Sequence, residues 1–222
     1  MKLLSQFLDL LFPPKCPFCG KITDSPGICP ACRAALPWVP DEETVRELPG
    51  GVRCAAPLWY GGLAREGLLR FKFQSHSAAA RTLGELIAQC AAEHFGGEFD
   101  TVTWVPVSRK RLRQRGYDQA ELLARSACRL WGVSAERLLE KRRDTPAQSS
   151  LESADARREN VADVYQARNA AGKRVLLIDD ICTTGATLAS CARTLREAGA
   201  ESVVCAAVAR TPQEKVHSSV KE

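Results

Sequence analysis

The stretch RVLLIDDICTTGAT, residues 174–187, decides how this chain is expected to fold. Its first part, residues 174–178, is an apolar run of the kind found in a strand that is covered on both faces in a parallel sheet. Asp179 and Asp180 follow at the tip of this strand, and three threonines and a glycine then lead into a helix predicted from Thr187 to Ala198. The order strand, acidic turn and helix is typical of a ligand-binding α/β protein.

The turn after the two carboxylates has the chemistry of an anion site. Successive backbone N–H groups that enter a helix form a concavity for anions, which the positive end of the helix dipole strengthens. Gly185 permits the turn, and the hydroxyls of Thr183, Thr184 and Thr187 can donate to a phosphate monoester. The carboxylates would repel that phosphate, so we expect them to bind sugar hydroxyls and to support Mg²⁺. A ribose 5-phosphate suits both halves; the alternative is an acidic cap on an ordinary turn.

The rest of the chain alternates between strand and helix patterns. Strands are predicted at residues 54–60, 101–105 and 202–209, and helices at residues 63–70, 78–95 and 119–131. This alternation predicts an α/β fold with a mostly parallel sheet flanked by helices, in which ligands bind at the carboxyl ends of the strands. Residues 141–160 carry no sustained period and are predicted to form a long excursion.

A basic segment follows the strand predicted at residues 101–105. Five of the seven residues from Arg109 to Arg115 are basic, whereas the whole chain has a formal charge of only +5. This concentration of charge indicates an anionic partner such as a phosphate ester, pyrophosphate or nucleic acid. The alternative is a solvated cationic loop.

Four cysteines near the start of the chain have the spacing of a zinc site. They are Cys16, Cys19, Cys29 and Cys32, in a C-x2-C-x9-C-x2-C pattern. Two thiolate pairs at this spacing can form a tetrahedral site for structural Zn²⁺, the alternatives being redox-active or incidental cysteines. Most of the other cysteines lie in or beside presumed core elements and are expected to be small buried residues.

The composition changes after the cysteine module. An acidic run from Asp41 to Glu47, followed by Pro49-Gly50-Gly51, marks a linker. We therefore divide the chain into residues 1–50, with an N-terminal helix, the zinc module and the linker; residues 51–212, the α/β domain; and residues 213–222, a flexible tail.

The first fourteen residues are apolar but short. They have neither the cleavage site of a signal peptide nor the length of a membrane span, and Leu4, Phe7, Leu8 and Leu11 fall on one helical face. A small helix that docks onto the protein is expected; the alternatives are a partner or a membrane surface. We expect a cytoplasmic protein with reduced thiols, at most peripheral at the inner face of the membrane.

Further motifs accompany the acidic turn. They are Leu11-Phe12-Pro13-Pro14, Phe71-Lys72-Phe73, Val105-Pro106-Val107, Arg115-Gly116-Tyr117-x-Gln119-Ala120, Thr145-Pro146-x-Gln148, Arg157-x-x-Asn160-Val161 and Ala209-Arg210-Thr211. Together they resemble the ComF family from about Leu10 to Thr211, and the acidic turn resembles the loop of type I phosphoribosyltransferases that binds phosphoribosyl pyrophosphate (PRPP).

The resemblance implies a type I phosphoribosyltransferase fold, Mg²⁺-PRPP as ligand and a role in competence on the cytoplasmic side of DNA uptake. It implies Asp179 and Asp180 as catalytic residues. The implied PRPP-binding residues are Ile181, Cys182, Thr183, Thr184, Gly185, Ala186 and Thr187. The loop after the first core strand usually holds pyrophosphate in this fold, which assigns Arg113, Arg115 and Gly116 to that side. Lys72 is a further candidate, with a surface cap as its alternative role.

One position departs from the family pattern. Asp118 stands where the family commonly has Asn, and we expect it to cap the following helix. No convincing general base is found, because His76, His94 and His217 are isolated and His94 is expected at a helix end.

Two functions follow from these observations. As a transferase, the protein would let an acceptor displace pyrophosphate from the ribose, with the excursion at residues 141–160 closing over the site. The alternative is an accessory protein that binds single-stranded DNA and uses PRPP for regulation, in which the zinc module, the basic segment and Arg142 and Arg143 follow the DNA backbone. DNA-uptake proteins are the further partners that this reading implies.

Overall fold

The computed structural model describes residues 13–73, 77–142 and 164–212. The helices are α2 (Pro30–Ala35), α3 (Asp41–Thr44), α4 (Gly62–Phe73), α5 (Ser77–Phe95), α6 (Arg109–Arg115), α7 (Gln119–Trp131) and α9 (Ala186–Glu197). The strands are β1 (Val45–Leu48), β2 (Val52–Ala55), β3 (Leu58–Trp59), β4 (Thr101–Trp104), β5 (Leu139–Lys141), β6 (Tyr165–Ala167), β7 (Arg174–Cys182) and β8 (Ser202–Arg210).

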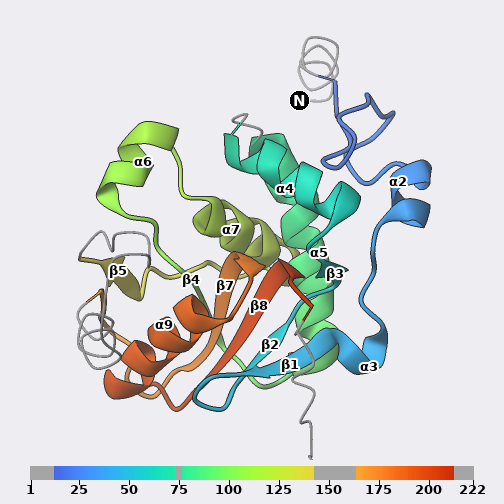
Figure 1. Cartoon of the computed structure of the whole chain (residues 1–222). Helices are drawn as coiled ribbons and strands as arrows, with labels where there is room; N and C mark the ends of the chain where they lie inside the picture. Colours follow the sequence, from blue (N-terminus) through green and yellow to red (C-terminus); the bar gives the residue numbers. More distant parts are fainter. Residues whose placement is uncertain (1–12, 74–76, 143–163, 213–222) are drawn as a thin grey trace, which may run out of the picture.

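A six-stranded sheet forms the centre of the molecule (Figure 1). Its order is β1-β2-β8-β7-β4, with β3 also paired to β8. β2, β3 and β7 pair with β8 in parallel, β4 pairs with β7 in parallel, and β1 pairs with β2 in antiparallel fashion. The predicted mostly parallel α/β fold is therefore confirmed. Strands β5 and β6 form a separate antiparallel pair.

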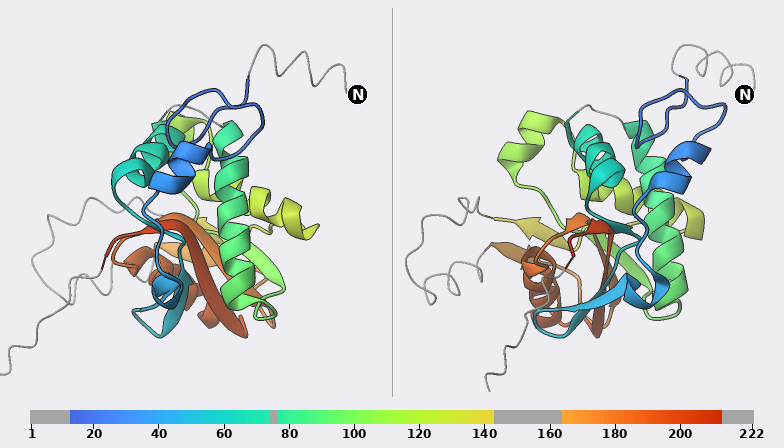
Figure 2. Two further views of the ribbon diagram at one scale, coloured as in Figure 1. Left: turned by 90° about the vertical axis from the view of Figure 1, so that its right-hand side faces the viewer. Right: turned by 45° about the vertical axis from the view of Figure 1, so that its right-hand side comes forward.

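Helices cover both faces of the sheet (Figure 2). α5 and α7 pack together on one face, and α9 lies against β7 and β8 on the other. Because side chains alternate along a strand, β7 supplies both layers: Leu176 and Ile178 join the core under α5 and α7, and Val175 and Leu177 join the core under α9. The carboxyl end of β7 thus leaves a fully covered strand, as its apolar sequence predicted.

Several boundaries differ from the sequence predictions. The strand predicted at residues 54–60 consists of β2 and β3 with Pro57 between them, because proline has no N–H to donate to a ladder. β7 extends to Cys182 instead of ending at residue 178, because its pairing with β8 continues to Arg210. The acidic stretch predicted as a linker forms α3 and β1, and β1 pairs with β2 along its whole length.

Some predictions lie outside the described residues. They concern the N-terminal segment up to residue 12, His76, most of the excursion with its two motifs, His217 and the tail from residue 213. The division of the chain at residues 50 and 212 stays a prediction. In the described part of the chain, no helix is both long and apolar enough for a membrane span.

Candidate functional site

The two acidic residues lie in the last part of β7. Asp179 is paired in register with Ala207 of β8, and the backbone N–H of Asp180 donates to Oδ1 of Asp179 at 2.8 Å. Burial raises the pKa of Asp179 well above its ordinary value, and the neighbouring Asp180 carboxylate raises it further. A cation would relieve both effects, so this pair is suited to hold a metal ion or several hydroxyl donors.

The turn from Thr183 to Gly185 joins β7 to α9. Thr183 and Thr184 are exposed, and the Thr184 hydroxyl accepts a hydrogen bond from the N–H of Ala186 at 3.3 Å. Gly185 has a left-handed backbone with φ of 78°, and a Cβ atom there would lie 2.6 Å from Cδ2 of Leu48. Both the conformation and the space require glycine. The turn therefore presents exposed hydroxyls at the positive end of α9.

Two described residues beside this turn were missed by sequence reasoning. Tyr165 of β6 lies near Asp179: burial raises the pKa of its phenol, and Cys191 and Asp179 add to the rise, while Arg111 opposes it. Arg46 of β1 donates to the Cys182 sulfur at 2.9 Å. Neither residue is close in sequence to the acidic turn, so no local pattern could reveal them.

Cys182 points into the protein from the end of β7. Its side chain is 1% exposed, and Cys54 lies beside it. A hydrogen bond from Cys54 lowers the pKa of Cys182 to about 6 although burial opposes the shift, and the guanidiniums of Arg46 and Arg210 also favour the thiolate. The sulfur thus faces buried arginines, and only the backbone of this residue borders the turn.

The basic segment is a helix, which corrects its prediction as a loop. α6 begins after Ser108, whose hydroxyl accepts from the N–H of Arg111 at 3.3 Å. It ends at Gly116, which is left-handed and donates its N–H to Leu112 at 2.8 Å. This cap pair was the available signal and was outweighed by the run of charge. Helix formation places the basic side chains around a short cylinder.

The predicted pyrophosphate-side residues are only partly gathered. Arg115 donates to Gln119 at 3.1 Å, and the Gln119 amide donates to the carbonyl of Lys72 at 3.4 Å. Tyr117 also binds the end of α4, through its hydroxyl and the carbonyl of Phe71 at 2.6 Å. Lys72 and Arg115 are thereby brought into one neighbourhood. Arg113 lies exposed on α6.

Asp118 is a helix cap, as the sequence predicted. Its carboxylate accepts from the N–H of Glu121 at 3.3 Å and from the N–H of Val107 at 3.0 Å, and the residue is 6% exposed. Burial raises the pKa of this carboxyl. Its charge is therefore used to tie the residues after β4 to the start of α7.

The four N-terminal cysteines meet in one cluster. Their ligand atoms all lie within 4.8 Å of one another, and the sulfurs of Cys19 and Cys29 are 3.7 Å apart. Tetrahedral Zn–S bonds of about 2.3 Å require sulfurs roughly 3.8 Å apart, so the cluster fits zinc. Although burial opposes it, backbone hydrogen bonds, the largest from Cys29, lower the pKa of Cys16 to about 7. These donors favour the thiolate that a metal needs.

The cysteine cluster is seated on α4. Phe18 is fully buried, and a Cβ atom on Gly67 would lie 2.6 Å from its ring. Arg70 donates to the carbonyl of Phe18. The knuckle between Cys16 and Cys19 thus packs into a notch on the helix whose far end carries Lys72.

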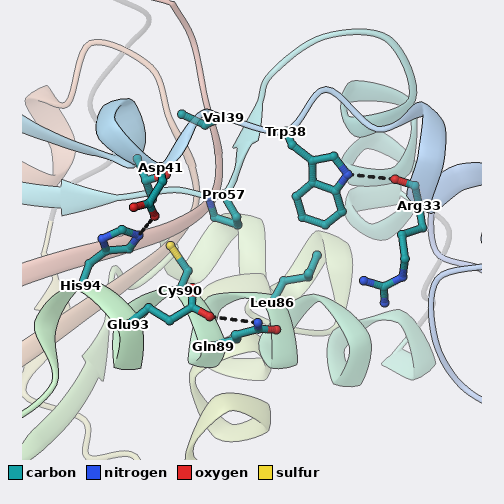
Figure 3. A pocket seen from close by; sticks show the side chains of 11 residues that line it. Arg33, Trp38, Val39, Asp41, Pro57, Leu86, Gln89, Cys90, Glu93 and His94 are labelled. Carbon is teal, nitrogen blue, oxygen red and sulfur yellow. Dashed lines mark hydrogen bonds and ion pairs between the residues drawn. The ribbon is translucent and has the colours of Figure 1, made fainter.

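A separate cleft lies between α5 and the segment that follows the zinc module (Figure 3). It has a volume of about 250 Å³ and contains none of the predicted catalytic or ligand residues. Trp38 forms one wall and donates its indole N–H to the carbonyl of Arg33 at 2.9 Å. His94 lies near the end of α5, as predicted, and its Nε2 is 3.5 Å from Asp41.

Comparisons with known proteins agree with this geometry. The family model "Phosphoribosyl transferase domain" matches residues 72–221, and the model "Double zinc ribbon domain" matches residues 7–65. The chain belongs to the phosphoribosyl transferase domain family.

Relatives of this chain include proteins named for competence. Competence protein ComFC of Bacillus subtilis is 26% identical over 83% of this chain and 72% of its own length. Competence protein F of Haemophilus influenzae is 29% identical over 64% of this chain and 65% of its own. A structure of glutamine PRPP amidotransferase from B. subtilis, complexed with ADP and GMP, aligns with a TM-score of 0.45 and 25% identity over 62% of this chain and 30% of that one.

The chain therefore combines two features that the sequence predicted. The phosphoribosyl transferase domain carries the acidic turn at the carboxyl end of a central parallel strand. The zinc ribbon match and the four-thiol cluster support structural zinc in the N-terminal module.

Proposed function

We propose that this protein binds Mg²⁺-PRPP at residues 179–187 and transfers its phosphoribosyl group in the service of DNA uptake. The observation that carries the proposal is the arrangement at the end of β7, where Asp179 and Asp180 precede a turn with exposed threonine hydroxyls at the start of α9. The family match supports the chemistry, and the competence names of the two relatives support the biological role.

The proposed chemistry divides along the site. The ribose hydroxyls would be held by Asp179 and Asp180, and the 5-phosphate by the N–H groups and hydroxyls from Ile181 to Thr187. Bound Mg²⁺ would supply charge neutralisation for the pyrophosphate leaving group. Lys72, Arg113, Arg115 and Gly116 lie on the pyrophosphate side in this proposal. An acceptor then attacks the anomeric carbon of the ribose while the bond between that carbon and the pyrophosphate oxygen breaks.

The experiment is a calorimetric titration of Mg²⁺-PRPP into the wild type and the Asp179→Asn, Asp180→Asn variant. The Glu42→Gln, Glu43→Gln variant is the matched control, since it removes two exposed adjacent carboxylates from α3. Binding that is lost only in the Asp variant, while its fold persists, supports the site and justifies a screen for pyrophosphate release. Absence of PRPP binding by the wild type contradicts the proposal.

A second function rests on the exposed arginines of α6. A protein that binds single-stranded DNA with this helix would use the PRPP site for regulation without turnover. DNA affinity of the same three proteins separates the two functions, because this alternative predicts salt-sensitive DNA binding that the Asp179 and Asp180 substitutions leave unchanged. In both cases we place the protein in the cytoplasm, at most peripheral at the membrane, with DNA-uptake proteins as its partners.

A further inference from the structure

Arg46 is a buried arginine whose contacts converge on the turn after β7. The residue is 8% exposed. Its Nη2 lies 3.4 Å from the carbonyl oxygen of Cys182 and also donates to the carbonyl of Thr183, while Nη1 donates to the carbonyl of Thr211 at 3.3 Å. These acceptors lie at least 136 positions along the chain from Arg46. One side chain therefore joins β1 to the ends of β7 and β8.

Two other groups hold the same carbonyls. Thr211 donates its N–H to the carbonyl of Cys182 at 3.1 Å and its hydroxyl to the carbonyl of Thr183 at 3.2 Å. Leu48 lies two residues after Arg46, on the same face of β1, and its side chain packs against Gly185. The turn is thus fixed from one side by a strand and by the residue that follows β8.

The orientation of these carbonyls decides where the next N–H groups point. In a trans peptide the C=O of one residue and the N–H of the next point in opposite directions, and the described chain has no cis bond. Because the carbonyls of Cys182 and Thr183 both face Arg46, the N–H groups of Thr183 and Thr184 both face away from it. Neither N–H donates to an acceptor among the described residues. Adjacent N–H groups on one side form a nest for anions.

We propose that Arg46 is a positioning residue that orients the N–H groups of Thr183 and Thr184 toward the 5-phosphate, an inference that rests on the proposed PRPP site. It does not touch the ligand: it holds the back of the turn, and Leu48 and Thr211 assist it. This assigns β1, which precedes the residues matched by the phosphoribosyl transferase model, to the phosphate-binding half of the site.

The cost of burying Arg46 supports a functional role. In the described part of the chain no carboxylate pairs with it, its one anionic partner is the Cys182 sulfur at 2.9 Å, and its Nε has no hydrogen-bond partner. Even a paired buried charge has a high desolvation cost, and apolar side chains would often serve stability alone as well or better. Arg210 is buried nearby at 4% exposure and also favours the Cys182 thiolate, but among the described residues its side chain donates to the carbonyl of Glu43 and to no carbonyl of the turn. It is therefore a matched control.

The test compares Arg46→Lys, Arg46→Met, Thr211→Val and the control Arg210→Met with the wild type. Ribose 5-phosphate and pyrophosphate are titrated separately by calorimetry, and thermal unfolding reports stability. Arg46→Met should bind ribose 5-phosphate at least about tenfold more weakly, because the hydrogen bonds that orient its donors are lost. Arg46→Lys and Thr211→Val should lose less. Pyrophosphate affinity should be unchanged in all four, which a general loss of structure would not produce.

Backbone amide NMR on the ligand-free proteins tests the orientation directly. The amide signals of Thr183 and Thr184 should shift in the Arg46 and Thr211 variants, and by a smaller amount in Arg210→Met. Unchanged ribose 5-phosphate affinity in Arg46→Met, or an equal loss in Arg210→Met at equal stability, overturns the role of Arg46 while the PRPP site stands. A wild type that binds neither PRPP nor ribose 5-phosphate overturns the proposed function itself, and the role of Arg46 with it.

Discussion

Two neighbouring segments at the same edge of the sheet, both assigned to anion binding in the proposed function, are built in opposite ways. β4 and β7 are parallel neighbours, so the basic segment around α6 and the acidic turn before α9 leave the sheet at one edge. The acidic turn is fixed from behind by β1 and by the residue after β8, whereas Arg109, Arg111 and Arg113 stand exposed on α6, a helix of seven residues. In the proposed function, the acidic turn would therefore select its ligand by geometry and the basic helix would attract it by charge.

Two glycines with the same backbone conformation allow the two segments to be compared directly. Gly185 and Gly116 both have φ of 78°, but a Cβ atom on Gly185 would meet Leu48 at 2.6 Å and one on Gly116 would meet nothing within 4 Å. Gly116→Ala should cost about 1–2 kcal/mol of unfolding free energy from backbone strain alone. Gly185→Ala should cost about 2–5 kcal/mol, since overpacking against a buried leucine is added. Urea unfolding of both variants measures the difference.

Leu48→Ala supplies the control for the Gly185 prediction. Combined with Gly185→Ala, it should recover about 1–3 kcal/mol relative to the sum of the two single changes, because the clash is removed. Additive effects would show that only the backbone conformation requires glycine at position 185. Equal costs of Gly185→Ala and Gly116→Ala would contradict the close packing of Leu48 against the acidic turn.

The next effect concerns pH and the acidic turn. The pKa of Asp179 is raised above its ordinary 3.8 in the folded state. At a pH between the unfolded-state and the folded-state pKa, the carboxyl is therefore protonated in the native protein and ionised in the unfolded chain. Stability therefore falls as pH rises through that window. Asp179→Asn should abolish this fall and stabilise the metal-free protein at pH 7, by roughly 1.4 kcal/mol for each unit of the shift. Urea unfolding from pH 4 to 8 measures it.

Asp100 gives the opposite sign and serves as the comparison. Although burial opposes it, hydrogen bonds from Arg174 lower the pKa of this carboxyl, so its contribution is present at pH 7 and is lost as pH falls below 3.8. Asp100→Asn should reduce stability slightly at pH 7. If Asp179→Asn also destabilises there, the raised pKa of Asp179 is wrong.

A smaller effect is expected at the cap between the two turns. Asp118→Ala removes the acceptor for the N–H groups of Glu121 and Val107 and should cost about 1–2 kcal/mol in thermal or urea unfolding. Asp118→Asn keeps one acceptor oxygen but places an amide NH2 where the second carboxylate oxygen accepts, so it should lose about 0.5–1 kcal/mol. Equal losses in the two variants would mean that both carboxylate oxygens are needed.

The smallest effect on stability is predicted on α6. Arg109 pairs with Glu140 at 3.1 Å, but its side chain is 83% exposed, so Arg109→Ala should change the unfolding free energy by less than about 0.5 kcal/mol. The same is expected of Arg81→Ala on α5, whose pair with Glu85 is 3.0 Å long and also exposed. Pyrophosphate affinity at low salt should fall only in Arg109→Ala. A fall in both variants would contradict attraction by the basic helix.

The sequence predicted those parts of the molecule whose signals are local. α7 has the predicted bounds because Asp118 and Gly132 cap it and its apolar residues keep helical spacing. The central strand was recognised from its apolar run, and the four cysteines from their spacing. Each of these signals is complete within about twenty residues.

The missed parts depend on contacts between distant segments. β1 was predicted as a linker because its charged residues suggest an exposed segment. Arg46 is nevertheless buried, and the groups that contact it belong to residues 182, 183 and 211. Tyr165 likewise meets the acidic pair only through the fold. α6 was missed for a different reason: its caps were present at Ser108 and Gly116, but the dense charge favoured a loop.

The position of β1 also bears on how the protein can be cut for laboratory work. A fragment that starts at Gly51 would retain every residue of the acidic turn and still lose Arg46 and Leu48, the two side chains that brace it. Such a fragment would also expose β2 as a new sheet edge, open to pairing with another chain. Fragments intended for ligand studies should therefore begin before Asp41, so that α3 and β1 stay with the sheet.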